Sequence, residues 1–196
     1  MYTYTYNNMA KNLSQRLKVL IESKKTVFRA KDFQSLWQEN PRNTVIIAKR
    51  MVAKNLILKL AKGYYALNEE YNIYELANLI ISPSYVSFNS ALFFWGACFQ
   101  VSDTAQSVSL LNYQKEVGGR IYKYQAMKKT LFYNLEGVDS KNNISVASPE
   151  RALLDLFYFG VAANIDDWEK INKTYLNKLA RSYPLSVQKK VKDLKL

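Results

Sequence analysis

Residues 40–67 read NPRNTVIIAKRMVAKNLILKLAKGYYAL, and they decide the fold of the first part of the chain. Asn40 is a favourable N-cap, and Pro41 takes the first helical position, where its missing N–H is not needed. With about 100° between successive residues, one side of this helix gathers Thr44, Val45, Ala48, Met51 and Val52. We therefore predict an amphipathic helix that buries this side and turns a polar, basic side outward.

The hydrophobic period changes after Asn55. Two runs rich in β-favouring residues follow, at positions 56–60 and 64–67, and Ala61-Lys62-Gly63 connects them. A short connection containing glycine between two such runs predicts a β-hairpin. A helix followed directly by a hairpin is the outline of a winged helix, in which the hairpin forms the wing.

The same stretch contains six Lys or Arg residues and no Asp or Glu, which suits a surface that faces phosphates. The N-terminal half of such a helix enters the major groove, so Arg42 and Asn43 are best placed to read base edges. The candidate DNA-binding residues, which include phosphate contacts from the end of the helix and from the wing, are Arg42, Asn43, Lys49, Arg50, Lys54, Lys59 and Lys62. The alternative is a small basic element whose charged face is only solvated.

The preceding residues complete this module. Positions 10–23 and 30–38 have helical hydrophobic spacing, with a strand-like step at Val27-Phe28 between them. Polar Asn68-Glu69-Glu70 ends the basic run. We expect an α+β protein in three parts: a tail at residues 1–9, a winged helix-turn-helix DNA-binding domain at 10–70, and a mixed α/β C-terminal domain with a small, mostly antiparallel sheet at 71–196.

Composition narrows the possible functions. The 196 residues have a formal net charge of +12, and residues 1–70 carry thirteen basic and five acidic side chains, so the first third is the polyanion-binding part. The chain has no histidine, the commonest general base, and its single Cys98 cannot form a disulfide framework or a zinc site. No signal peptide or apolar run long enough for a membrane span is present. We expect a cytoplasmic protein without cofactor, metal or catalytic site.

The second part mixes helices and strands. We predict helices at 72–82, 86–98, 149–159, 166–182 and 185–194, and strands at 106–111, 119–125, 130–134 and 143–147. Residues 112–118 and 136–142 are predicted loops, and Gly118-Gly119 is a turn. The apolar helix 86–98, capped by Ser87, should lie deep in a core. The last helix is basic, which indicates either a solvated face or a second polyanion contact.

Three motifs resemble a known family. GYYAL (63–67), SPSYVSFNSALFFWG (82–96) and ISVASPERALLDLFY (144–158), in this order and at this spacing, resemble the AbiEi antitoxins, which are also described as transcriptional regulators of viral defence. The resemblance covers about residues 10–160. One departure is Trp95, which stands where many relatives have a histidine.

The resemblance implies a transcriptional autorepressor and antitoxin. Its winged helix would bind inverted repeats in the promoter of its own operon, and its C-terminal domain would counter a nucleotidyltransferase-like toxin encoded next to it. Such pairs are type IV, abortive-infection systems for phage defence, in which a stable complex is not generally found. The candidates that the resemblance gives for the antitoxin domain are Tyr85, Ser87, Ser90, Glu150, Arg151 and Asp155.

Several alternatives stay open. Glu150, Arg151 and Asp155 have spacing that also serves to stabilise a helix or to dock it on a sheet. The basic module would equally suit a protein-interaction domain that grips an acidic partner or a toxin directly, or a general winged-helix regulator without antitoxin role. A metal-dependent nuclease would need carboxylates, and those considered are Asp103, Glu116, Asp139 and Asp155.

Overall fold

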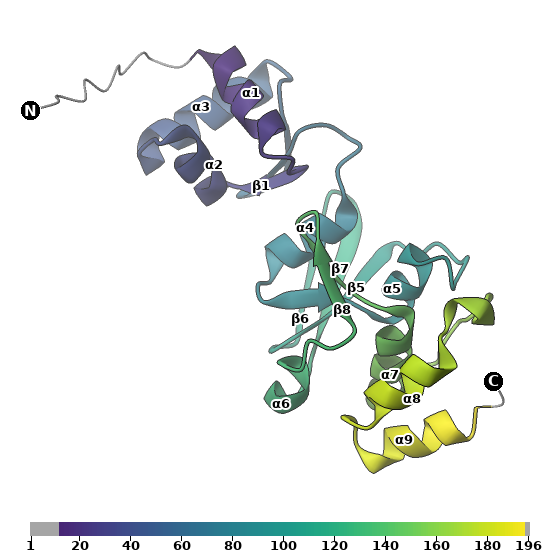
Figure 1. Ribbon diagram of the computed structural model, residues 1–196. Coiled ribbons are helices and arrows are strands. Elements are labelled where there is room, and N and C mark those ends of the chain that lie inside the picture. The colour runs from purple at the N-terminus through teal and green to yellow at the C-terminus, as the bar shows by residue number, and fades with distance from the viewer. Residues whose placement is uncertain (1–11, 195–196) are drawn as a thin grey trace, which may run out of the picture. The chain divides into compact units, whose positions relative to one another are not determined.

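The computed structural model describes residues 12–194 (Figure 1). The chain forms two compact units, Met1–Tyr71 (unit 1) and Asn72–Leu196 (unit 2). The tail predicted at residues 1–9 lies outside the described residues. Within the described chain, no helix has both the length and the apolar character needed to cross a membrane.

Unit 1 consists of helices followed by a hairpin, with one further strand between the first two helices. Its elements are α1 (Leu13–Glu22), β1 (Val27–Arg29), α2 (Ala30–Trp37), α3 (Pro41–Ala53), β2 (Leu58–Ala61) and β3 (Tyr64–Ala66). β3 is the central strand and pairs antiparallel with both β1 and β2. The three predicted helices and the predicted hairpin are therefore confirmed as elements of secondary structure.

Aromatic side chains form the core of unit 1. The rings of Phe33 and Trp37, one turn apart on α2, stack with their centroids 4.4 Å apart, and Phe28 and Tyr65 flank Phe33. α3 adds Met51 to this core, together with Thr44 and Ala48. As the sequence predicted, Asn40 caps α3: its side chain accepts the Asn43 N–H at 2.9 Å.

The buried side of α3 is narrower than predicted. Val45 is exposed and Val52 is only half-buried. The inward side is centred on Thr44, Ala48 and Met51. Because one residue turns the helix by about 100°, Val45 lies beside this stripe instead of within it.

Unit 2 is built on a six-stranded mixed sheet with the order β6-β7-β5-β4-β9-β8. The strands are β4 (Ser84–Val86), β5 (Thr104–Ser109), β6 (Tyr113–Val117), β7 (Arg120–Ala126), β8 (Val138–Lys141) and β9 (Ile144–Ala147). The pairs β6–β7, β5–β4 and β9–β8 are antiparallel, whereas β7–β5 and β4–β9 are parallel. The α+β class predicted from the sequence is confirmed.

Helices cover both faces of this sheet. They are α4 (Ile73–Ile80), α5 (Phe88–Phe94), α6 (Lys129–Phe132), α7 (Pro149–Phe159), the 3-10 turn η1 (Trp168–Lys170), α8 (Lys173–Ala180) and α9 (Leu185–Lys192). On one face, the Tyr124 hydroxyl of β7 donates to the Ala77 carbonyl of α4 at 2.6 Å. On the other face, the Tyr85 hydroxyl of β4 donates to Asp155 of α7 at 3.1 Å. α7 also packs against α5, α8 and α9 (Figure 1).

Both segments that the sequence predicted as loops are edge strands. Residues 112–118 contain β6 and residues 136–142 contain β8, and these strands form the two edges of the sheet. An edge strand buries little, so it shows no alternating hydrophobic pattern from which it can be recognised. Each edge strand is held by hydrogen bonds to the neighbouring strand, to which a tight turn connects it. The turn is Gly118-Gly119 for β6 and Asn142-Asn143 for β8, and all four of these residues have positive φ.

Other boundaries also differ from prediction. The predicted strand 130–134 is wrong, because Thr130, Leu131 and Phe132 belong to α6, in which Leu131 and Phe132 are both buried. The predicted helix 86–98 is shorter, since Val86 belongs to β4 and α5 ends at Phe94. Phe93, Phe94 and Trp95 are partly exposed, so the end of α5 does not lie deep in a core, whereas Ala97 and Cys98 after it are buried. The predicted helix 166–182 is divided into η1 and α8.

Candidate functional site

The candidate DNA-binding residues form one exposed set in unit 1. α3 supplies four of them, its C-cap Lys54 is the fifth, and the β2–β3 hairpin supplies the other two. All seven side chains are exposed: Arg42, Asn43, Lys49, Arg50, Lys54, Lys59 and Lys62. We call this set the basic surface. Since the inner side of α3 is buried in the aromatic core, Arg42, Lys49 and Arg50 are held on the outer side of this helix.

The start of α3 is tied to α1 through Glu39. The Glu39 carboxylate accepts a hydrogen bond from the Arg16 guanidinium at 2.6 Å and from the Asn43 amide at 3.3 Å. Arg16 is itself buried on α1. Asn43, a predicted reader of bases, therefore already uses one of its two amide N–H donors within the protein.

The tip of the hairpin presents Lys62. Gly63 follows it with φ of +84°, a left-handed conformation that suits glycine. The Gly63 carbonyl accepts the Ala30 N–H at 3.2 Å, which ties the hairpin to the first residue of α2. Lys59 lies on β2 opposite Tyr65 of β3, a core residue. Lys62 in the turn and Lys59 on β2 are thus both exposed on a hairpin that is anchored to the body of unit 1.

The motif residues of unit 2 meet in a buried polar network. Arg151 and Asp155 lie one turn apart on α7, with 3.4 Å between Arg151 Nε and an Asp155 oxygen. The other Asp155 oxygen accepts hydrogen bonds from the Ser87 hydroxyl at 2.6 Å and the Tyr85 hydroxyl at 3.1 Å. The Tyr183 hydroxyl also donates to Asp155. This carboxylate therefore connects α7 to β4, to the start of α5 and to the segment before α9.

The Arg151 guanidinium binds the chain between β7 and β8. It donates to the backbone carbonyls of Asn134 at 2.8 Å, Glu136 at 3.2 Å and Leu131 at 3.1 Å. It also donates to the Tyr85 hydroxyl at 3.1 Å and lies over the Tyr85 and Tyr183 rings. One buried side chain thus fixes the α6 segment against α7.

Burial and charge set the pKa values in this network. Burial raises the pKa values of Tyr85 and Tyr183 well above the ordinary tyrosine value near 10.0, and the nearby Asp155 carboxylate raises them further. Burial also raises the pKa of Asp155, although Arg151 and the hydroxyls of Ser87, Tyr183 and Tyr85 lower it. Burial lowers the pKa of Arg151, but Asp155 and the tyrosines raise it more, so the guanidinium stays charged.

Glu150 and Ser90 also make internal contacts. The Glu150 carboxylate accepts the Asn172 N–H at 2.7 Å and the Ser148 hydroxyl at 2.8 Å, so it fixes the residue that caps α8. The Ser90 hydroxyl accepts the Gln106 N–H at 2.9 Å and thereby ties α5 to β5.

All six antitoxin-domain candidates are consequently interior residues: Tyr85, Ser87, Ser90, Glu150, Arg151 and Asp155. The contacts of Glu150, Arg151 and Asp155 correspond to the docking role that their spacing also allowed. Sequence reasoning did not single out Tyr183, which lies 28 positions after Asp155 in no recognisable motif.

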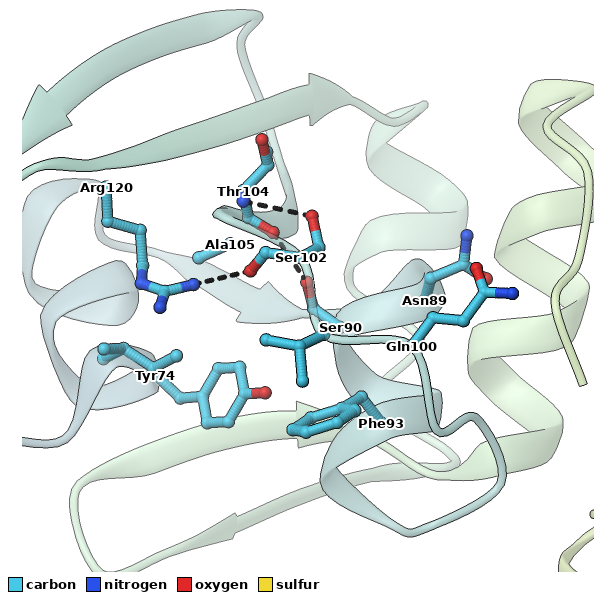
Figure 2. Close-up of a pocket in the computed structure, with 11 residues that line it drawn as sticks. Tyr74, Asn89, Ser90, Phe93, Gln100, Ser102, Thr104, Ala105 and Arg120 are labelled. Atoms are coloured by element: carbon cyan, nitrogen blue, oxygen red, sulfur yellow. Dashed lines mark hydrogen bonds between the residues drawn. The ribbon is translucent and has the colours of Figure 1, made fainter. Parts of the chain in front are cut away.

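A small pocket lies between α4, α5 and the start of β5 (Figure 2). Tyr74, Phe93 and Arg120 line it, together with polar residues that bond to one another. Arg120 donates to the Ser102 carbonyl at 2.6 Å, and the Ser90 hydroxyl donates to the Thr104 carbonyl at 3.3 Å (Figure 2). The polar groups that line the pocket are therefore used in hydrogen bonds within the fold.

The carboxylates considered for a nuclease do not come together. Glu116 lies on β6 and Asp139 on β8, at opposite edges of the sheet. Asp103 precedes β5, and Asp155 is enclosed in the network with Arg151. Among residues 12–194, no group of three or more potential ligands of the types His, Cys, Asp and Glu is placed to hold a metal ion.

Apolar side chains are exposed after α5. Phe99 is 66% exposed and Val101 75%, and Phe93 and Phe94 at the end of α5 are partly exposed. Trp95, at the position where the resemblance led us to expect histidine, donates its indole N–H to the Ala147 carbonyl at 2.8 Å and so joins α5 to β9. No model of a protein family matches the chain, and no curated protein matches it.

Proposed function

We propose that the protein binds double-stranded DNA through the basic surface of unit 1. The observation that carries this proposal is the combination of seven exposed candidate residues with a stretch, residues 40–67, that contains no acidic residue. Such a surface attracts the phosphate backbone and releases condensed counterions on binding. A face that only contacts water could carry both positive and negative side chains, whereas these 28 consecutive positions carry positive charges alone.

The order of elements supports a winged-helix mode of binding. α1, α2 and α3 are followed by the β2–β3 hairpin, and β1 completes its sheet. In this mode, the N-terminal half of α3 enters the major groove and Arg42 contacts base edges, while Lys62 at the hairpin tip contacts phosphates. The buried stripe of Thr44, Ala48 and Met51 would keep α3 fixed during binding.

The biological role that we propose is that of an autorepressor and antitoxin, acting in the cytoplasm on the promoter of its own operon. The antitoxin part is supported by the resemblance of the two motifs of unit 2 to AbiEi proteins. The buried network explains why these residues occur in the motifs, because Tyr85, Arg151 and Asp155 join β4 to α7 and stabilise the fold of unit 2. Any contact with a nucleotidyltransferase-like toxin or its target must then use other, exposed residues.

The experiment for DNA binding uses the full chain and a labelled duplex from directly upstream of its own coding region. We expect saturable binding that weakens steeply between low and moderate salt. An equally tight interaction with an acidic protein but none with this duplex would favour the protein-interaction alternative.

The exposed residues after α5 favour a second role of unit 2 in protein contact. Contiguous apolar residues on a surface often mark interaction sites. Co-expression with the product of the adjacent gene, which we propose to be the toxin, tests this role: F99S and V101S should lose protection while the protein stays folded. Protection by both variants at the wild-type level would exclude these residues as the contact.

A further inference from the structure

The exposed side of α3 carries two apolar side chains among its charges. Val45 is 44% exposed and Ile46 is 40% exposed. In the described part of unit 1, the only other large apolar side chain exposed to this degree is Ile21 of α1. α3 therefore concentrates apolar surface on the side that it turns to solvent.

These apolar side chains alternate with cations. Ile46 lies four positions after Arg42 and four before Arg50, so one helical turn separates it from each. Val45 stands in the same relation to Lys49. Any DNA that meets the arginines and lysines of α3 must also meet Val45 and Ile46.

Phosphates offer an apolar side chain no favourable contact. The major groove does, because thymine is the one standard base that presents a methyl group there. Asn43 is partly restrained, since one of its two amide hydrogens already bonds to Glu39 at 3.3 Å. The chemistry of the exposed side of α3 thus combines cations for phosphates or guanine with apolar groups for thymine.

We propose that Val45 and Ile46 contact thymine methyl groups in the major groove, so that the DNA sites of this protein contain thymine where α3 lies. This inference rests on the proposed function, because it requires α3 to enter the groove. It adds the identity of a recognised base and two specificity-determining residues that are not charged.

The test compares two duplexes that differ only in this methyl group. The region upstream of the coding sequence is amplified once with dTTP and once with dUTP, and the full-length protein is titrated against each at fixed salt. Removing one buried methyl group should weaken binding by about fourfold, and more if several are contacted. The V45A/I46A double variant should bind both duplexes equally.

I21A is the matched control. Ile21 lies five positions after Arg16 on α1, about 140° around the helix from the side that faces Glu39. This variant should keep the wild-type ratio of affinities, and thermal unfolding of all variants checks that they are folded.

The outcomes separate this inference from the proposed function. If the wild-type protein binds both duplexes equally well, the methyl contact is wrong although DNA binding stands. If V45A/I46A keeps the wild-type ratio, the methyl contact does not involve these residues and the inference is also wrong. If the wild-type protein binds neither duplex, DNA binding itself fails.

Discussion

Arg151 and Asp155 stand one turn apart on α7, and their charged groups are 3.4 Å apart with neither side chain exposed to solvent. A buried ion pair contributes little relative to a well-packed apolar core, but breaking it leaves an uncompensated charge. Here each partner makes further hydrogen bonds: Asp155 accepts from three hydroxyl groups, and Arg151 donates to three backbone carbonyls. The main role of the pair is therefore to hold several segments of unit 2 against α7.

Removing the charge of Asp155 should destabilise unit 2 strongly. D155N keeps the shape of the side chain but leaves the Arg151 cation buried without a counterion, so the free energy of unfolding should fall by about 3–5 kcal/mol. Urea unfolding followed by circular dichroism measures this. D139N is the control, because the pair of Asp139 with Lys141 is largely exposed and contributes at most about 1 kcal/mol. Equal stabilities of the two variants would disprove this role of Asp155.

Glu150 should hold the start of α8. In E150A the Asn172 N–H loses its partner at 2.7 Å, and the free energy of unfolding should fall by about 1–3 kcal/mol. Hydrogen exchange gives the more specific readout, because protection of α8 amides should decrease more than that of α4 amides. Uniform loss of protection across unit 2 would show that Glu150 acts on the whole fold.

The buried tyrosines predict loss of stability at alkaline pH. The folded-state pKa values of Tyr85 and Tyr183 are raised, so above about pH 10 the unfolded chain releases protons that the folded chain keeps. The stabilising effect is fully present below that pH and declines above it by up to about 1.4 kcal/mol per pH unit for each tyrosine. Y183F removes one such group, so its stability should fall less steeply with pH. Urea midpoints between pH 9 and pH 11 test this, and an unchanged slope would contradict it.

On DNA, R42A and K62A should fail in different ways. Arg42 is assigned to base edges, so R42A should lose about 1–3 kcal/mol on the upstream duplex and discriminate less against unrelated duplexes. Lys62 is assigned to phosphates, so K62A should weaken binding to all duplexes by a similar factor. Competition titrations with unrelated DNA distinguish these results. Wild-type binding by both variants would mean that α3 and the hairpin are not the DNA contact.

Local sequence signals predicted the elements of unit 1 well. Asn40 and Pro41 mark the start of α3, and Ser148 with Pro149 marks α7 in unit 2, because caps and prolines act within one turn of the chain. The basic surface could be predicted for the same reason: exposed charges on an amphipathic helix follow from its period.

What the sequence did not predict depends on partners distant along the chain. β6 and β8 are strands because they pair with β7 and β9, and neither has an apolar period of its own. Tyr183 joins Asp155 only after α8 and α9 fold back onto α7. The resemblance found Tyr85, Ser87, Arg151 and Asp155 as a group, but their burial and their common contacts required the structure.

The central claim is that α3 and the hairpin bind the DNA backbone, and the salt dependence of binding tests it most directly. The logarithm of affinity should fall linearly with the logarithm of salt concentration, with a slope of about −0.9 per phosphate contact. K49Q and K62Q should each make this slope less negative by about 0.9. The matched control is K18Q on α1, whose side chain is exposed and pairs with Glu22.

Lys18 lies two positions after Arg16, about 200° around α1 from the side that faces Glu39, so K18Q should keep the wild-type slope. Shallower slopes are expected for the α3 and hairpin variants alone. Identical slopes for the wild-type protein, K49Q and K62Q, or an equal change in K18Q, would contradict it.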